Sequence, residues 1–193
     1  MWIFGYGSLT WKADFEFHRR VVGYIKGYKR RFWQASIDHR GVQQQKQFWL
    51  LRLYRVLYMP GRVVTLVPGD LTDIVWGVAY EVSDELLSEG SSLNIREKSY
   101  QERRQETVYA ADGASFSALV FIGTSDPSLR LGPAPPEDMA RQIARAVGPS
   151  GPNSTYLFNL ATFMRTEVPH YKDEHLVQLE ELVKHLQDTV QIK

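Results

Sequence analysis

The order of its segments constrains the fold of this chain more strongly than any single motif. The first two thirds hold short apolar and β-branched runs that are typical of strands, from residues 2–4 through to 116–122. The last third holds three helical patterns, which begin near Pro135, Asn153 and Asp173. Strands followed by helices, with no linker or repeat between them, predict an α+β fold in a single domain that spans residues 1–193.

Local patterns predict the individual elements. The clearest is a central strand at 73–82, where apolar and aromatic residues run almost without interruption. A helix is expected to begin at Asp84 with Ser83 as its N-cap, to weaken at Gly90 and to resume over 93–98. Asn153 or Ser154 is expected to cap the second of the late helices. The remaining expected elements are strands at 21–25, 31–35, 61–67, 104–110 and 116–122 and helices at 135–147, 153–165 and 173–188.

The first strand breaks into the turn Gly5-Tyr6-Gly7-Ser8. Two glycines around a tyrosine let the backbone bend sharply, and such a turn can aim several N–H groups at one anion. The dinucleotide fingerprint G-x-G-x-x-G fails because Thr10 replaces the third glycine, and the nucleophile elbow G-x-S-x-G fails as well. From these residues alone, an anion cradle and a plain tight turn after a core strand both stay open.

Composition narrows the chemistry. The chain has no cysteine, which excludes disulfides, thiol nucleophiles and cysteine-based zinc sites. His170 and His175 do not have the spacing of a helical zinc pair, and no serine has a clear histidine and acid arrangement. A carboxylate is therefore the expected catalytic group if the protein is an enzyme. The sequence therefore predicts no metal site. Because it shows no signal peptide and no apolar run of about 20 residues, it predicts a cytoplasmic protein without a membrane span.

A basic and aromatic stretch follows the first strand. Residues 18–31 carry six lysines and arginines and no acid, interleaved with aromatic residues that continue to Trp33. That composition suits a surface for single-stranded nucleic acid. The net charge of +1 for the whole chain instead favours two strands with one solvated basic face. We therefore expect no nucleic-acid partner, and a nucleic-acid binder remains the alternative.

An apolar segment separates the polar turn at 38–41 from the strand at 61–67. Residues 43–60 open with glutamines and continue as an apolar run broken mainly by two arginines, which fits neither a clean helix nor a clean strand. Outside the core, this segment would expose an apolar contact surface. In the turn before it, His39 is expected to be structural rather than a general base.

Eight blocks of sequence follow one another in order along nearly the whole chain: residues 4–9, 31–32 with 38–41, 61–66, 76–80, 96–98, 120–123, 131–135 and 148–153. These blocks resemble ChaC-type γ-glutamylcyclotransferases of the glutathione-specific kind, and they look closest to plant members. One block would be a weak signal, but together they are highly specific. Three features depart from the family pattern: the insertion at 43–60, the loosening sequence at 90–92, and Ser99 before Tyr100, where many members have a glycine pair.

The resemblance implies a small mixed β-barrel flanked by helices, and a lyase that splits glutathione into 5-oxoproline and cysteinyl-glycine without a cofactor. It implies that Glu97 is the acid/base, and Tyr100 is a candidate substrate contact. A non-catalytic binding domain, its site spoiled by the insertion, remains an alternative, and no partner protein is implied. The resemblance also assigns the γ-glutamyl end of the substrate to Ile3, Phe4, Gly5, Tyr6, Gly7, Ser8 and Leu9.

Overall fold

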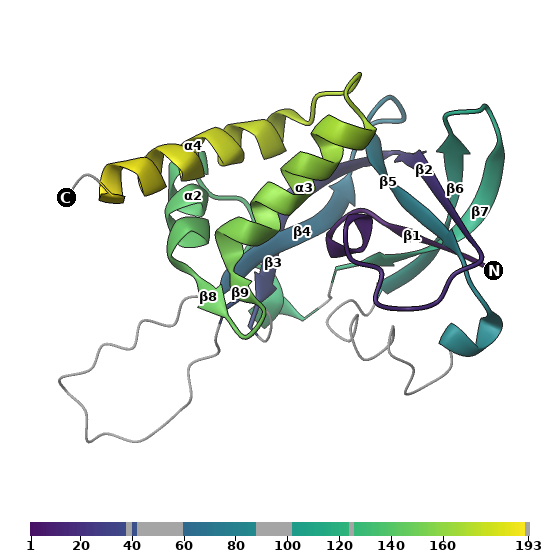
Figure 1. Ribbon diagram of the computed structural model, residues 1–193, viewed down its shortest axis with the longest axis horizontal. Coiled ribbons are helices and arrows are strands. Elements are labelled where there is room, and N and C mark those ends of the chain that lie inside the picture. The colour runs from purple at the N-terminus through teal and green to yellow at the C-terminus, as the bar shows by residue number, and fades with distance from the viewer. Residues whose placement is uncertain (38–39, 42–59, 88–101, 124–125, 192–193) are drawn as a thin grey trace.

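Five strands form a closed barrel at one end of the molecule (Figure 1). The computed structural model describes residues 1–37, 40–41, 60–87, 102–123 and 126–191. The order of the strands around the barrel is β1-β5-β2-β6-β7. Neighbouring strands run antiparallel, except that β1 and β7 pair in parallel and so close the barrel. The barrel strands are β1 (Trp2–Gly5), β2 (Arg19–Lys26), β5 (Ile74–Glu81), β6 (Glu102–Ala110) and β7 (Ser115–Ile122).

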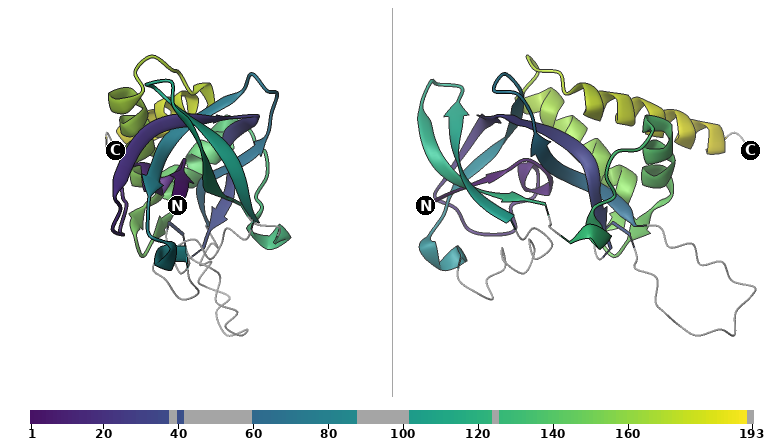
Figure 2. Two further views of the ribbon diagram at one scale, coloured as in Figure 1. Left: turned by 90° about the vertical axis from the view of Figure 1, so that its right-hand side faces the viewer. Right: turned by 180° about the vertical axis from the view of Figure 1, so that it is seen from behind.

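A two-stranded hairpin joins this barrel to a layer of helices. Strands β3 (Tyr28–Ser36) and β4 (Gly61–Pro68) pair antiparallel, with a shift of register between Arg31 and Gln34. Helices α2 (Pro136–Arg145), α3 (Asn153–Glu167) and α4 (Glu174–Gln191) pack together and contact the hairpin, as the two views of Figure 2 show. The remaining elements are the short strands β8 (Val147–Gly148) and β9 (Gly151–Pro152) and the 3₁₀ turns η1 (Ser8–Thr10), η2 (Asp84–Leu87) and η3 (Pro127–Leu129).

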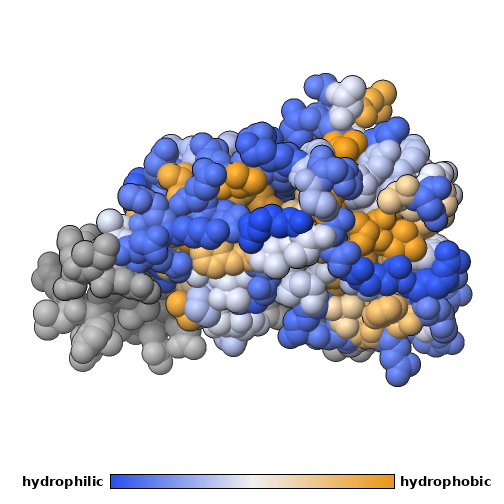
Figure 3. All heavy atoms as spheres, turned by 45° about the horizontal axis from the view of Figure 1, so that its top comes forward, coloured by the Kyte–Doolittle hydropathy of each residue, from blue (hydrophilic) through white to orange (hydrophobic). Residues whose placement is uncertain are grey.

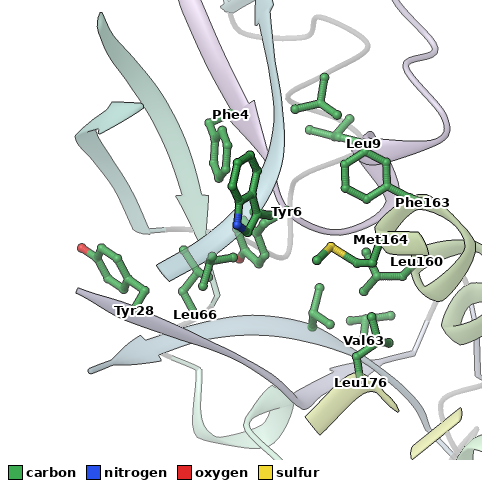
Figure 4. Packing of buried hydrophobic residues seen from close by; sticks show 14 of the residues in the cluster. Phe4, Tyr6, Leu9, Tyr28, Val63, Leu66, Leu160, Phe163, Met164 and Leu176 are labelled. Atoms are coloured by element: carbon green, nitrogen blue, oxygen red, sulfur yellow. The ribbon is translucent and has the colours of Figure 1, made fainter. Parts of the chain in front are cut away.

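One hydrophobic core runs from the barrel through the hairpin to the helices. Strand β5 is buried along almost its whole length, because both of its faces are covered. In Figure 4, Phe4 from β1, Leu66 from β4 and Met164 from α3 all point into this shared core. The face of the molecule seen in Figure 3 is mostly hydrophilic, with smaller hydrophobic patches. Within the described ranges, no helix is both long and apolar enough to cross a bilayer.

The α+β architecture with a flanked barrel is confirmed, and the ends of the expected strands lie within three residues of the observed ones. One helix cap was predicted wrongly. Pro152 occupies the N-cap of α3, and Asn153 is the first helical residue. The buried Asn153 amide instead accepts from the backbone N–H of Arg62 at 2.7 Å and donates to the Arg62 carbonyl at 2.8 Å. It therefore fastens the start of α3 to β4, a tertiary role that a local capping pattern does not reveal.

Two further expectations meet gaps in the description. The helix expected from Asp84 is seen only as the 3₁₀ turn Asp84–Leu87, and its continuation lies outside the described residues. Nearly all of the insertion predicted at 43–60 also lies outside them, so that boundary stays a prediction. The basic stretch does form the two expected strands. However, Arg30 is only 2% exposed and does not belong to a solvated face.

A half-buried histidine joins β3 to α4. The backbone N–H of Phe32 donates to His175 Nε2 at 3.2 Å, so the ring must be neutral at that nitrogen. Burial, and secondarily the nearby Arg31 charge, lower the pKa of His175 from 6.5 to about 4. The folded protein therefore resists protonation that the unfolded chain accepts, and it should lose stability as the pH falls between these two values.

This loss of stability predicts the behaviour of His175→Gln. Between pH 6.5 and pH 4, the histidine should cost the wild type about 3 kcal/mol of unfolding free energy. A glutamine side chain offers an oxygen acceptor but does not titrate in this pH range. As the pH falls, the unfolding free energy of the variant should therefore rise relative to that of the wild type by about 3 kcal/mol. Urea denaturation at several pH values measures it. The control His185→Gln changes an exposed histidine, and its stability should depend on pH as that of the wild type does. If the stability of His175→Gln also followed the wild type at every pH, the lowered pKa of His175 would be contradicted.

Candidate active site

The turn after β1 forms a backbone cradle, which we define as residues 5–9. Two buried tyrosines hold it in place from different sides. Tyr6 Oη donates to the carbonyl of Phe121 in β7 at 2.9 Å, and Tyr80 Oη in β5 donates to the carbonyl of Leu9 at 2.8 Å. Because both anchors are barrel strands, the cradle has a fixed position at the barrel wall.

The glycines in the cradle are required by close packing. A Cβ on Gly7 would lie 2.7 Å from Tyr156 Oη and 2.9 Å from Val64 Cγ2, and one on Gly5 would lie 2.3 Å from the Cβ of Leu9. Cβ atoms do not approach other heavy atoms this closely. The absence of side chains here also leaves the backbone accessible to a ligand.

The hydrogen bonds of the cradle orient its backbone. The Gly7 carbonyl accepts the Thr10 N–H at 2.9 Å, and the Ser8 carbonyl accepts the Lys12 N–H at 3.0 Å, so both carbonyls turn toward η1. Across the described part of the chain, no acceptor takes the N–H groups of Gly7 and Leu9. Successive amide donors in such a turn form a concave site for an anion such as a carboxylate.

A cleft opens over the cradle. It contains about 300 Å³ of space free of protein atoms when the solvent at its mouth is included, but only about 30 Å³ of this space can hold the centre of a water molecule. The cleft therefore has room for little more than a water, and a larger ligand would extend out of its open mouth. The lining residues come from β1, the cradle, β4, β7 and α3: Phe4, Gly5, Tyr6, Gly7, Ser8, Leu9, Val64, Phe121 and Tyr156.

Six of the seven predicted binding residues line this cleft. The exception is Ile3, which is fully buried in the core and is absent from the cleft wall. Glu97 and Tyr100 lie outside the described residues, so their assignments stay predictions.

Three cleft residues were not singled out from the sequence. They are Val64, Phe121 and Tyr156. Val64 and Phe121 fall inside blocks that carry the family resemblance, and Tyr156 follows such a block by three residues. Position in or beside a block was therefore the only sequence signal that could have pointed to these residues. No pattern indicated that these three segments meet at one cradle. Among the residues described, no group of three or more His, Asp or Glu side chains is arranged to hold a metal ion.

Comparison with known proteins agrees with this architecture. The family model described as ChaC-like protein matches residues 1–186. The chain belongs to the ChaC-like family. Its cradle, barrel and helices are therefore those of a ChaC-like protein, and the resemblance drawn from the eight sequence blocks is confirmed.

Relatives of this ChaC-like chain span nearly its whole length. Glutathione-specific gamma-glutamylcyclotransferase 1 of Danio rerio is 44% identical over 186 residues, which cover 93% of this chain and 87% of that protein. Gamma-glutamylcyclotransferase 2-3 of Arabidopsis thaliana is 38% identical over 195 residues, which cover 96% and 89%. A crystal structure of the yeast γ-glutamyl cyclotransferase specific to glutathione superposes with a TM-score of 0.80 at 27% identity, over 96% of each chain.

Proposed function

We propose that this ChaC-like protein is a lyase that degrades glutathione to 5-oxoproline and cysteinyl-glycine. The observation that carries the proposal is the glycine cradle, which lines a cleft and in which the N–H groups of Gly7 and Leu9 have no acceptor among the described residues. Relatives at 38–44% identity are named as γ-glutamylcyclotransferases, and the one from Danio rerio is named as specific for glutathione. In keeping with a glutathione-degrading role, we place the protein in the cytoplasm.

The cradle would hold the α-carboxylate of the γ-glutamyl group. The N–H groups of Gly7 and Leu9 suit an anionic oxygen, and the hydroxyl of Tyr156 borders the same space. With the carboxylate fixed, the flexible glutamyl chain is folded back so that its own α-amine faces its γ-carbonyl. Because nucleophile and electrophile belong to one molecule, effective molarities of about 10⁵ M or more become accessible.

For the reaction itself, the protein then has to assist only proton transfers. The α-nitrogen attacks the γ-carbon and forms the ring C–N bond, and the amide C–N bond to cysteine breaks. In all, two protons pass from the attacking nitrogen to the leaving nitrogen, so no water and no cofactor is consumed. An α-amine with a pKa of about 8 is only partly deprotonated at neutral pH, so one carboxylate suffices as the base. We assign that role to Glu97, and further substrate contact to Tyr100, on the family resemblance.

Incubation of the purified protein with glutathione tests this function. We expect 5-oxoproline and cysteinyl-glycine to appear in equal amounts, measured by chromatography. A parallel incubation with γ-glutamyl-alanine tests specificity, and we expect that dipeptide to be a poorer substrate. Glutathione that binds but remains intact would support the non-catalytic alternative and would overturn the proposed reaction.

A further inference from the structure

A second pocket lies at the junction of β3, β5 and α4, and it shares no lining residue with the cleft over the cradle. We call it the basic pocket. Its volume is about 190 Å³, room for several waters or a small ion. It is lined by Tyr28, Lys29, Arg30, Arg31, Asp73, Ile74, Tyr171, Lys172, Asp173, Glu174 and His175.

Three cationic side chains border the mouth of the basic pocket. Lys29 pairs with Asp73 at 3.2 Å, and Lys172 pairs with Glu174 at 3.1 Å. Such solvent-exposed pairs contribute little to stability, so their lysines can turn to another anion at small cost. Arg31 donates to a backbone carbonyl at 2.7 Å, and no carboxylate in the described ranges pairs with it.

A buried guanidinium contributes to the wall of the basic pocket. Arg30 is 2% exposed, and one of its terminal nitrogens donates to the carbonyl of Trp76. Its Nε and its other terminal nitrogen have no hydrogen-bond partner, although Nε lies 3.6 Å from a carboxylate oxygen of Asp173. Buried donors without an acceptor are costly, about 1–3 kcal/mol each and more for a charged group. Because these nitrogens have almost no exposed surface, a ligand in the pocket does not reach them, and Arg30 contributes its positive charge rather than a hydrogen bond.

We propose that the basic pocket binds a small tetrahedral oxyanion of the phosphate class. Lys29 and Arg31 come from β3 and Lys172 from the segment before α4, so cationic donors from two separate parts of the chain line the pocket. A tetrahedral oxyanion can accept hydrogen bonds from several separate donors at once, whereas a planar carboxylate can be satisfied by a single guanidinium.

The acids of the basic pocket limit how tightly it binds the oxyanion. Asp73, Asp173 and Glu174 face the same space and repel the anion. Because four cations are set against these three acids and His175 is neutral, the excess charge of the pocket is a single positive unit. The dissociation constant for the oxyanion should therefore lie in the millimolar range, and tighter binding is not expected.

Calorimetric titration of the full-length protein with inorganic phosphate tests the proposal, with chloride at matched ionic strength as the blank. Arg31→Gln should weaken phosphate binding by about tenfold, because it removes a charge-assisted donor. Asp73→Asn should act in the opposite direction and strengthen binding by about threefold, because it removes a repelling charge and releases Lys29. Arg145→Gln, at the exposed end of α2, removes the same charge far from the pocket and should bind phosphate as the wild type does.

Circular dichroism confirms that each variant is folded. If Arg31→Gln unfolds, Lys29→Gln replaces it with the same expected direction. Absence of phosphate binding to the wild type, or equal affinity in Arg31→Gln and wild type, would overturn the proposal. So would Arg31-dependent binding of single-stranded RNA with a steep salt dependence and none of inorganic phosphate, which would restore the nucleic-acid alternative. Release of 5-oxoproline is measured separately, so failure here leaves the proposed function unaffected.

Discussion

Glu97→Gln is expected to abolish release of 5-oxoproline from glutathione while the protein stays folded. The amide keeps the size of the side chain but cannot take a proton from the α-ammonium or return one to the leaving nitrogen. General acid–base catalysis contributes about 10²- to 10⁴-fold, so kcat should fall by that factor. Because the proposed holder of the substrate carboxylate is the backbone of the cradle, which this substitution does not alter, KM should change far less. Steady-state assays of 5-oxoproline give both constants.

A neighbouring glutamate provides the control for this variant. Glu102, at the start of β6, is exposed and pairs with Arg104 on the barrel surface. Glu102→Gln removes the same charge five residues further along the chain and should leave both kcat and KM unchanged. Near-normal turnover in Glu97→Gln would assign the proton transfers to another group. An equal loss in both variants would point to a general effect of charge on the barrel instead.

The strands of the barrel were predictable because their signal is local. The stretch around Val75–Tyr80 combines β-branched and aromatic residues with flanking polar ones, and burial on both faces explains why the apolar run is unbroken. The helices were equally clear from their spacing, and Asp173 does cap α4, where its side chain accepts the N–H of Leu176 at 3.2 Å. These elements follow from neighbours in sequence, which is the information that a single chain provides.

The features that escaped prediction all depend on contacts distant in sequence. The glycines of the cradle indicated a tight turn, but not that the hydroxyl of Tyr156 lies against one of them. The basic run around Arg30 suggested a solvated face. On a strand, however, alternate residues point to opposite sides, and Tyr28, Arg30 and Phe32 all turn inward. Burial of the middle arginine was therefore implicit in the alternation, but only the packing of α4 against this face made it visible.

Gly7→Ala should impair catalysis far more than it impairs folding. The new Cβ would lie 2.7 Å from Tyr156 Oη and 2.9 Å from Val64 Cγ2, so either the cradle or these two side chains must move. Overpacking of this kind costs about 1–3 kcal/mol of stability. A displacement of about 1 Å in a group that positions the substrate can cost about 10²-fold in rate, so kcat/KM should fall by that order. Substrate kinetics and urea denaturation of the same sample separate the two effects.

A glycine outside the site provides the matched control for Gly7→Ala. Gly113 lies in the turn between β6 and β7 with a φ of 87°, and a Cβ there would meet nothing within 4 Å. Gly113→Ala therefore strains the backbone and should cost about 1 kcal/mol or more of stability with no effect on kcat/KM. If both alanine variants lose activity in proportion to their loss of stability, the cradle is merely a structural turn. A selective loss of kcat/KM in Gly7→Ala requires that the close approach of the backbone to Tyr156 shapes the proposed glutathione site.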